Sequence, residues 1–233
     1  MIRRLRRRIR QIFPFLLPVW RRIKYVALAK QSPAESFTGI FRDNEWGSDQ
    51  SLSGPGSDLE QTEAVRAALP GLLKTLECRS MLDVPCGDFH WMQHVELNLS
   101  YIGGDIVAEL TAANQQRFGS GSRRFVTLDL ITDTLPRADI VFCRDCLVHL
   151  SNAHVHAALQ NIKRSGATYL LTTTFTARTR NTDIPTGAWR ALNLQLPPFG
   201  LPAPIQLVDE HCPLPDYRDK HLGLWKLDEI ELG

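Results

Sequence analysis

The N-terminal part of the sequence lacks an apolar run long enough to cross a membrane. Its apolar stretch, residues 12–20, has nine positions and is interrupted by Pro14 and Pro18, whereas a transmembrane helix needs about 20 apolar residues. It also lacks the small-residue cleavage site of a secretory signal, because Arg21 and Arg22 follow at once. We therefore predict neither a transmembrane helix nor a cleaved signal peptide in this segment.

Acidic residues are absent from the first 30 positions, which carry ten Lys or Arg. Residues 31–233 carry 17 basic and 25 acidic side chains, or −8, so the net charge of +2 conceals a basic arm on an acidic body. Such an arm, taken as residues 1–34, suits an anionic membrane surface, where each Lys or Arg contributes about 1 kcal/mol. A loosely docked or disordered tail is the alternative, and the acidic body disfavours nucleic acid as a partner.

The chain also lacks the paired cysteines of a disulfide-stabilised protein. Five cysteines are an odd number in a chain of 233 residues, which is long enough to bury a core without cross-links. A reducing compartment, the cytoplasm, fits this usage, with the basic arm placing the protein at the inner face of a membrane. Cys143 and Cys146 have the spacing of a redox motif, but neither a second such pair nor an HxxxH sequence completes a zinc site, so we predict no metal.

Regular apolar periodicity is missing between Phe37 and Ser57, where Gly, Ser, Asn and Asp are frequent. This composition is typical of a loop. Long irregular segments in compact domains often cover a ligand. Residues 35–57 are therefore either a connector or a lid, and as a lid they would turn Trp46 and the turn at residues 53–56 toward the ligand.

A helix is predicted directly after this loop. Ser57 and Glu60 have the spacing of a capping box, and apolar residues follow at helical intervals as far as Leu76. Pro70 lies inside this pattern and should divide it into two helical pieces.

The rest of the chain, residues 58–233, alternates strand-like and helical segments. Further helices are expected at residues 107–118 and 151–163. Seven runs of strand-forming residues are present, at 80–84, 101–105, 124–128, 139–144, 168–175, 205–209 and 222–226. The alternation predicts an α/β domain with a doubly wound, mostly parallel seven-stranded sheet. A Pro-rich passage at residues 178–204 interrupts this pattern as an insertion.

Two short sequences in this domain have the outline of a nucleotide site. The first, MLDVPCGD at residues 81–88, runs from a strand into a turn, and the second, YIGGDI at residues 101–106, contains another acid at a strand end. A tight turn followed by a carboxylate about 20 residues later is the arrangement that binds a nucleotide's ribose. The turn lacks the G-x-G-x-x-G sequence that binds a pyrophosphate, which weakens the case for a dinucleotide-dependent dehydrogenase.

Four motifs resemble the class I S-adenosylmethionine-dependent methyltransferases in order and in spacing. They are the two above, the third strand at 125–129, and ADIVFCRDCLVHL at 138–150. The resemblance implies a Rossmann-like methyltransferase fold, S-adenosyl-L-methionine as cofactor, and methyl transfer. In the family's D-x-G-x-G-x-G turn, Pro85 here holds the first glycine position and Phe89 the third, and proline lacks both an N–H and access to positive φ. Gly87 holds the second, and a helix starting after it could receive the cofactor's carboxylate.

The resemblance assigns cofactor contacts to individual positions. Asp83 would organise the turn and hold the methionyl amino group, Asp105 would accept from both ribose hydroxyls, and Asp129 would accept from the adenine amino group. Further contacts would fall on Pro85, Cys86, Gly87, Asp88, Ile106 and Leu130. From the residues alone, the three acids could also be a turn acid, a cap for the helix at residues 107–118 and a turn residue before Asp133.

Charged residues after the fourth strand are the candidates for the chemistry. Methyl transfer is an in-line displacement that depends mostly on alignment, and a hydroxyl acceptor gains about 10²–10⁴-fold from a base. Asp145 or His149 would be that base, on one helical face if a helix begins by Asp145. Arg144 would bind an anionic or hydroxyl-rich acceptor. The structural alternative is an ion pair of Arg144 with Asp145, with His149 as a cap or at the edge of the core.

Acceptor binding is assigned to residues of the irregular segments. Trp46, Asn181, Trp189 and Arg190 combine rings with amide and cationic groups, which suits the face and the hydroxyls of a sugar. The predicted function is O-methylation of a carbohydrate-like or small polar acceptor, a small molecule or a glycan. The alternatives are a non-catalytic scaffold that keeps the fold, and a nucleic-acid methyltransferase, against which the lack of an Asn-Pro-Pro-aromatic sequence counts.

Overall fold

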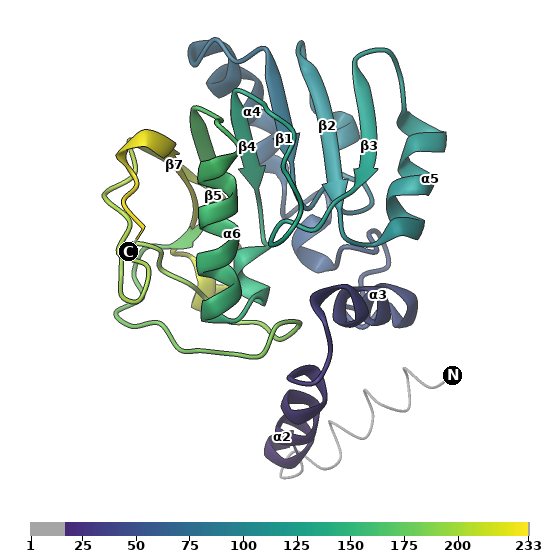
Figure 1. The fold of residues 1–233 in the computed structure, drawn as a ribbon, viewed down its shortest axis with the longest axis vertical. Helices are drawn as coiled ribbons and strands as arrows, with labels where there is room; N and C mark the ends of the chain where they lie inside the picture. The colour runs from purple at the N-terminus through teal and green to yellow at the C-terminus, as the bar shows by residue number, and fades with distance from the viewer. Residues whose placement is uncertain (1–16, 233) are drawn as a thin grey trace.

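A seven-stranded sheet forms the central layer of the computed structural model, which describes residues 17–232 (Figure 1). Residues 1–16 of the predicted basic arm lie outside the described residues. The strands are β1 (Ser80–Asp83), β2 (Ser100–Asp105), β3 (Arg123–Thr127), β4 (Ile140–Cys143), β5 (Tyr169–Phe175), β6 (Gln206–Asp209) and β7 (Lys220–Lys226). Their order is β3-β2-β1-β4-β5-β7-β6, and β7 alone runs in the direction opposite to that of the other six strands. The predicted α/β fold is confirmed, and each predicted strand lies within two residues of its observed ends.

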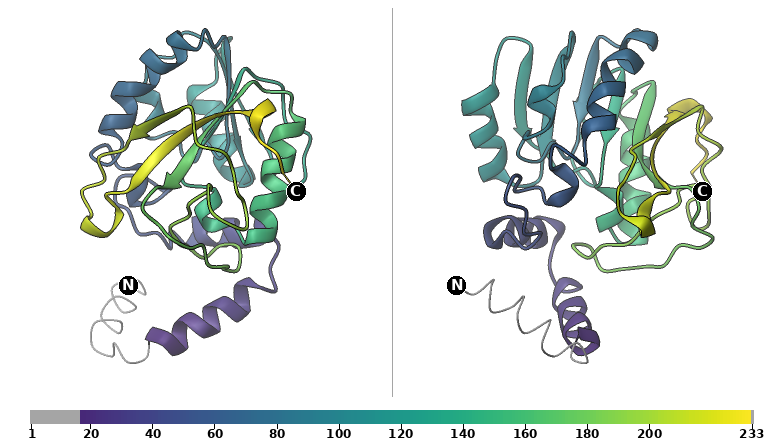
Figure 2. Two further views of the ribbon diagram at one scale, coloured as in Figure 1. Left: turned by 90° about the vertical axis from the view of Figure 1, so that its left-hand side faces the viewer. Right: turned by 180° about the vertical axis from the view of Figure 1, so that it is seen from behind.

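Helices cover both faces of the sheet (Figure 2). α4 (Glu63–Thr75) lies on one face and α6 (Asn152–Arg164) on the other, while α5 (Ala108–Phe118) packs beside β2 and β3. Successive strand residues point to opposite faces, so Met81 joins the core cluster under α4 and Leu82 joins the cluster under α6. The central strands β1 and β4 are therefore buried on both faces, which makes them conspicuous in the sequence.

Two helices, α2 (Leu17–Leu28) and α3 (Pro33–Asp43), precede the sheet and lie beyond the carboxyl ends of its parallel strands (Figure 1). The prediction of a loop from Phe37 is therefore wrong for its first residues. A capping box starts α3, since the Ser32 hydroxyl accepts from the Glu35 N–H and the Glu35 carboxylate accepts from the Ser32 N–H. Apolar side chains of this helix, spaced one turn apart, then pack against the rest of the protein. These contacts stabilise a helix whose polar residues had suggested a loop.

α4 differs from its prediction at its start and in its middle. The helix begins at Glu63 with Thr62 as its N-cap residue, while Ser57 ends a separate 3₁₀ turn, so the predicted capping box is wrong. Pro70 lies inside one continuous helix. A proline here removes one helical hydrogen bond, but the helix is anchored to the sheet on both sides of it by four buried side chains, Val65, Leu69, Leu72 and Leu73.

The remaining segments are irregular or short. Residues 178–204 contain no helix or strand and pack on the α6 side of the sheet through Leu192, Leu194, Phe199 and Leu201. Within residues 17–232, none of the helices combines the length and the apolarity that crossing a bilayer requires.

Candidate active site

A cavity of about 490 Å³ lies at the carboxyl ends of the parallel strands, within the range of roughly 300–1,000 Å³ that small-molecule sites have. The ends of β1, β2 and β4 and the turns after them form its floor, and α3 and residues 46–61 cover it. Figure 1 shows α3 beneath the arrowheads of the strands. This edge is where open α/β sheets bind their ligands.

Three acids at neighbouring strand ends line the cavity. Asp83 ends β1, Asp105 ends β2, and Asp129 follows β3 by two residues. Because the three strands are adjacent in the sheet, the side chains reach one cavity. The structure thus brings the predicted acids together, with Asp83 and Asp105 buried and Asp129 half-buried.

Asp83 is buried beside Tyr101, whose hydroxyl donates to Asp83 Oδ2 at 2.5 Å. Burial raises the pKa of Asp83 to about 8, against the opposing effect of the Tyr101 hydrogen bond. So high a pKa means that the protein does not fully compensate the charge of this carboxylate, and a cationic ligand in the cavity would complete the compensation. Tyr101 is absent from the predicted site residues, because a tyrosine within an apolar strand is typical of a core residue.

Asp105 joins the turn after β1 to the start of α5. Its Oδ1 accepts from the Val107 N–H at 3.0 Å, and its Oδ2 accepts from the Gly87 N–H at 3.1 Å. Burial raises the pKa of Asp105 to about 6, although the hydrogen bonds from Val107 and Gly87 act to lower it. The carboxylate therefore supports the residues just before α5 and lines the cavity. It does not cap the helix, because Val107 is the N-cap residue and no side-chain cap hydrogen bond is present.

The turn after β1 departs from the predicted one. Gly87 has φ +55°, and a Cβ there would lie 2.1 Å from Ser53 Oγ, so only glycine fits. Within the described residues the next element is the 3₁₀ turn Met92–His94, so the prediction of a helix start that receives the cofactor's carboxylate is wrong. Phe89 has φ +57°, and its buried ring, packed against three aromatic rings, holds this strained position.

Asp88 ties the turn to the segment that covers the cavity. Its carboxylate accepts from the Ser51 hydroxyl at 2.9 Å and from the Leu52 N–H at 2.7 Å. Its own N–H donates to Ser53 Oγ at 3.0 Å. These bonds stabilise the turn, which no helix follows directly. They also leave the Asp88 carboxylate hydrogen-bonded within the protein.

Asp129 forms a turn of its own, as the turn alternative holds. Its Oδ1 accepts from the Ile131 N–H at 2.8 Å and its Oδ2 accepts from the Thr132 hydroxyl at 3.0 Å. The cavity wall around it is apolar and consists of Ile106, Val107, Leu110, Leu128 and Leu130. This part of the cavity offers apolar surfaces to a flat ring, with acids at its edge.

Four charged side chains form a cluster on the side of β4 and β7. Arg144 donates from Nε and Nη2 to Glu210 Oε2 at 3.0 and 2.6 Å, and from Nη1 to the Gly56 carbonyl at 2.9 Å. Lys220 Nζ donates to Asp145 Oδ2 at 2.6 Å and lies 3.2 Å from Glu210 Oε2. The ion pair of the structural alternative is present, with 3.5 Å between Arg144 Nη1 and Asp145 Oδ2. Through its bond to Gly56, Arg144 therefore holds in place the segment that covers the cavity.

The cluster makes Asp145 strongly acidic. Burial would raise the pKa of Asp145, but the cations of the cluster, Lys220 first, outweigh it and lower the pKa to about 2. Glu210 and Lys220 are absent from the predicted site residues, since they lie 66 and 75 positions from their partners in the sequence. From sequence, Asp219 and Lys220 look like a solvated pair, but Lys220 is buried and Asp219 pairs with Arg178 at 2.7 Å.

His149 lines the cavity from a 3₁₀ turn before α6. Its Nδ1 lies 2.8 Å from the Ala188 carbonyl oxygen, which only accepts, so Nδ1 carries the hydrogen and Nε2 keeps its lone pair. Burial lowers the pKa of His149, against the opposing Ala188 hydrogen bond, so the ring is neutral near pH 7. Since α6 begins only after this turn, the predicted helical face shared with Asp145 is wrong, although both residues line the cavity.

Aromatic rings line the rest of the cavity: Phe37, Phe41, Trp46, Phe175, Trp189 and Tyr217. The Trp46 ring lies 5.1 Å from that of His149, and the Trp189 ring lies 5.0 Å from that of Tyr217. Two of the four residues predicted to bind an acceptor, Trp46 and Trp189, are thus at the cavity.

The other two, Asn181 and Arg190, are not among the lining residues. The Asn181 amide donates to backbone carbonyls of its own insertion, including that of Asn193 at 2.9 Å. The Arg190 guanidinium donates to the carbonyls of Leu147 and Val148, both at 3.1 Å. We correct their assignment, because these polar groups satisfy buried backbone of irregular segments.

Thiols are present at the site without forming a metal centre or a disulfide. Cys143 is buried in the core and Cys146 borders the cavity, and both are free. Among residues 17–232, no group of three or more His, Cys, Asp or Glu is arranged to hold a metal ion.

Solved structures share this architecture. No protein-family model matches the sequence, and no curated protein sequence matches it significantly. Human N-acetylserotonin methyltransferase, solved in complex with SAM, matches with a TM-score of 0.50 at 14% identity, over 81% of this chain and 65% of the human chain. The chain has the fold of the class I S-adenosylmethionine-dependent methyltransferases.

Other methyltransferases match this methyltransferase-fold chain less closely. The N-methyltransferase NodS from Bradyrhizobium japonicum, in complex with S-adenosyl-L-homocysteine, has a TM-score of 0.48 at 14% identity, over 58% of this chain and 73% of that one. Magnesium protoporphyrin IX methyltransferase from Synechocystis has a TM-score of 0.44 at 15% identity, over 62% and 71%. The chain spans just under two thirds, 65%, of the length of the human enzyme.

The cavity of this methyltransferase-fold chain has groups that fit a nucleoside with a cationic centre. The buried carboxyls of Asp83 and Asp105 suit positive charge and hydroxyl groups. The apolar wall around Leu128 and Leu130 suits an adenine ring, and Gly87 permits a close approach of the backbone. These residues could therefore hold S-adenosylmethionine.

Proposed function

We propose that the protein is an S-adenosylmethionine-dependent methyltransferase that methylates a hydroxyl oxygen of a small-molecule acceptor. The observation that supports this most is the pair of buried carboxyls, Asp83 and Asp105, at adjacent strand ends of a cavity that also contains His149. The part formed by these acids and their apolar wall is called the donor end. The part formed by Trp46, His149, Trp189 and the charged cluster is called the acceptor end.

The donor end would bind the cofactor, which when bound supplies a methyl group on a positively charged sulfur. Asp83 would hold the amino group and Asp105 the ribose hydroxyls, while the wall around Leu130 would enclose the adenine. Burial leaves both carboxyls short of compensating charge and raises their pKa values. A cationic ligand would therefore favour their ionised forms and gain from them in return.

His149 is the better of the two predicted bases. Nε2 of its neutral ring has a lone pair, whereas Asp145 has a pKa of about 2 and is held by Lys220. A general base works best when its pKa is near the working pH. His149 would accept the proton of the acceptor hydroxyl, and the hydrogen bond to Ala188 would keep its ring in place.

The acceptor would be held mainly by aromatic rings. Arg144, predicted to bind an anionic acceptor, is occupied by Glu210 and by the Gly56 carbonyl. Trp46 and Trp189 present large apolar surfaces to the cavity. This favours an acceptor with a flat or apolar body that carries the hydroxyl, and the face of a sugar stacked on the same rings is the second candidate.

Calorimetry and a transfer assay together test this function. We expect the folded full chain to bind S-adenosylhomocysteine. The absence of any heat of binding would contradict the proposal that the donor end binds the cofactor. Transfer of labelled methyl from S-adenosylmethionine to panels of phenols and sugars then tests the acceptor end. Binding of the homocysteine product without transfer to any acceptor would favour the non-catalytic alternative.

A further inference from the structure

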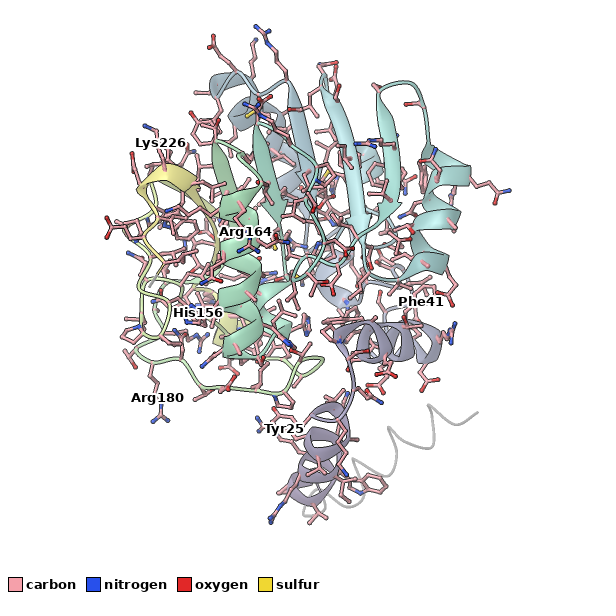
Figure 3. The ribbon with its side chains drawn as sticks, viewed as in Figure 1. Tyr25, Phe41, His156, Arg164, Arg180 and Lys226 are labelled. Carbon is pink, nitrogen blue, oxygen red and sulfur yellow. The ribbon has the colours of Figure 1, made fainter. Side chains whose placement is uncertain are left out.

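The helix α2 packs one of its sides on the body. Figure 2 shows α2 extending away from the sheet, and Figure 3 shows Tyr25 on the side toward the insertion. Leu28 is buried there against Ile184 and Ala188. Tyr25 packs on the same small cluster. The orientation of α2 is therefore set by specific side-chain contacts.

The other side of α2 carries a stripe of exposed apolar residues: Val19, Trp20, Ile23 and Val26, each with 53% to 58% of its surface exposed. Among the side chains of residues 18–232, no other large apolar one is as exposed. At about 100° per residue, Val19, Ile23 and Val26 fall within about 60° of one another, on the side opposite to Leu28. An apolar surface of this kind marks an interaction site.

Cations flank this apolar stripe. By helical position, Arg22 lies on one flank and Lys24 on the other. Lys24 also forms an ion pair with Glu45 at 2.5 Å, which further fixes the helix. Residues 1–30 contain ten Lys or Arg and no acid, whereas the rest of the chain has a net charge of −8. A partner that matched both features would combine an apolar interior with a negatively charged surface.

Anionic lipid has both properties. A second copy of the chain would bring like cations together around the stripe, and nucleic acid offers phosphates but no apolar surface for it. The 12 residues of α2 extend about 18 Å, short of the roughly 30 Å of a bilayer core, so the helix would lie along the membrane. We propose that α2 docks on an anionic membrane surface, with the apolar stripe between the headgroups and the acyl chains.

Sedimentation of the full chain with lipid vesicles tests this docking. We expect binding to vesicles of phosphatidylcholine with phosphatidylserine, much less to phosphatidylcholine alone, and release as salt rises. Combining Trp20→Ser with Ile23→Ser should lower the partition coefficient on the mixed vesicles by at least about tenfold. The matched control, Ile205→Ser with Leu207→Ser, removes two side chains that are 47% and 43% exposed and should bind as the wild type does.

A second readout reports whether the stripe enters the lipid. Brominated lipid should quench tryptophan fluorescence, and Trp20→Phe should remove most of this quenching. Equal binding by the wild type and the Trp20→Ser, Ile23→Ser variant would overturn the proposal, because charge alone would then hold the protein. So would a lipid-free dimer, seen by light scattering, that the same variant dissociates, since a second copy would then cover the stripe.

Discussion

The donor end and the acceptor end of the cavity differ in how far apart in sequence their contacts reach. At the donor end, Asp83, Asp105 and Asp129 follow consecutive strands and bind groups 2 to 18 positions away. At the acceptor end, the contact of Arg144 with Glu210 spans 66 positions of the sequence, and that of Lys220 with Asp145 spans 75. The donor end is thus built by one sheet edge, and the acceptor end by the meeting of distant segments.

The two ends also differ in how their charges are balanced. Burial raises the pKa values of Asp83 and Asp105, whereas Lys220 and Arg144 outweigh burial and lower that of Asp145. The donor end is therefore prepared for a positively charged ligand. The acceptor end has its charges paired within the protein, which leaves rings and one imidazole for a substrate.

Removal of the imidazole should affect only the acceptor end. We expect His149→Gln to lower kcat by about 10²–10⁴-fold, because the acceptor hydroxyl loses its base, while the affinity for S-adenosylhomocysteine stays unchanged. His211→Gln, at an exposed histidine, is the control. Kinetics of methyl transfer and calorimetry measure the two quantities, and a normal kcat in His149→Gln would remove the base from our assignment.

Breaking the charged cluster should cost stability. Arg144→Ala leaves Glu210 buried without its main partner, so we expect the free energy of unfolding to fall by about 3–5 kcal/mol in urea titrations. Arg42→Ala, which breaks the exposed ion pair with Glu109, is the control and should change little. Similar losses in the two variants would show that the cluster is not the buried support of the acceptor end.

The donor end should respond in ligand affinity. We expect Asp105→Ala to weaken S-adenosylhomocysteine binding by about tenfold to a hundredfold in calorimetry, because a buried charged acceptor is lost. Asp129→Ala should weaken it less, since that carboxylate is half-buried and already serves its own turn. A larger loss in Asp129→Ala would mean that the ligand lies differently along the strand ends.

The smallest expected effect is on the pH dependence of the free energy of unfolding, to which the donor end and the acceptor end contribute with opposite signs. Asp83 has a folded-state pKa of about 8, above its unfolded value, so the folded state keeps a proton that the unfolded state releases, and stability falls as pH rises toward 8. Asp145, with a pKa of about 2, has the opposite sign, and its stabilising contribution is lost only below about pH 4.

We therefore compare the wild type with Asp83→Asn between about pH 6.5 and 8, because both proteins contain His149 and Asp105 and the contributions of these two groups cancel in the difference. The free energy of unfolding of the wild type should fall relative to the variant by up to about 1.4 kcal/mol per pH unit. Urea titrations at several pH values measure this difference. Parallel profiles would show that Asp83 is ionised in the folded protein.

The sheet and the donor acids could be predicted because their signals are local. Strands buried on both faces are short apolar runs, and an acid at the end of each run, as at Asp83 and Asp105, marks the edge of the sheet. Helix α3 could have been found as well, since Ser32 and Glu35 form a capping box three residues apart. The high content of Gly and polar residues after it concealed that signal.

The acceptor end could not be predicted in the same way. Asn181 and Arg190 have the polarity of substrate-binding residues, yet they bind backbone carbonyls, and only the path of the irregular segments shows this. Lys220 stands beside Asp219 in sequence, but the antiparallel pairing of β7 brings it to Asp145. Which charges meet depends on chain segments that are remote in sequence.

By itself, the sequence determined the strands, their α/β alternation and the three acids at consecutive strand ends, because side-chain periodicity and turn chemistry act over a few residues. Only the tertiary structure decided that the turn after β1 is supported by residues 51–53, that Arg144 binds Glu210, and that His149 has Nε2 available. These outcomes depend on burial and on partners that folding brings together from distant positions, where the energies of charges and hydrogen bonds are set by their surroundings.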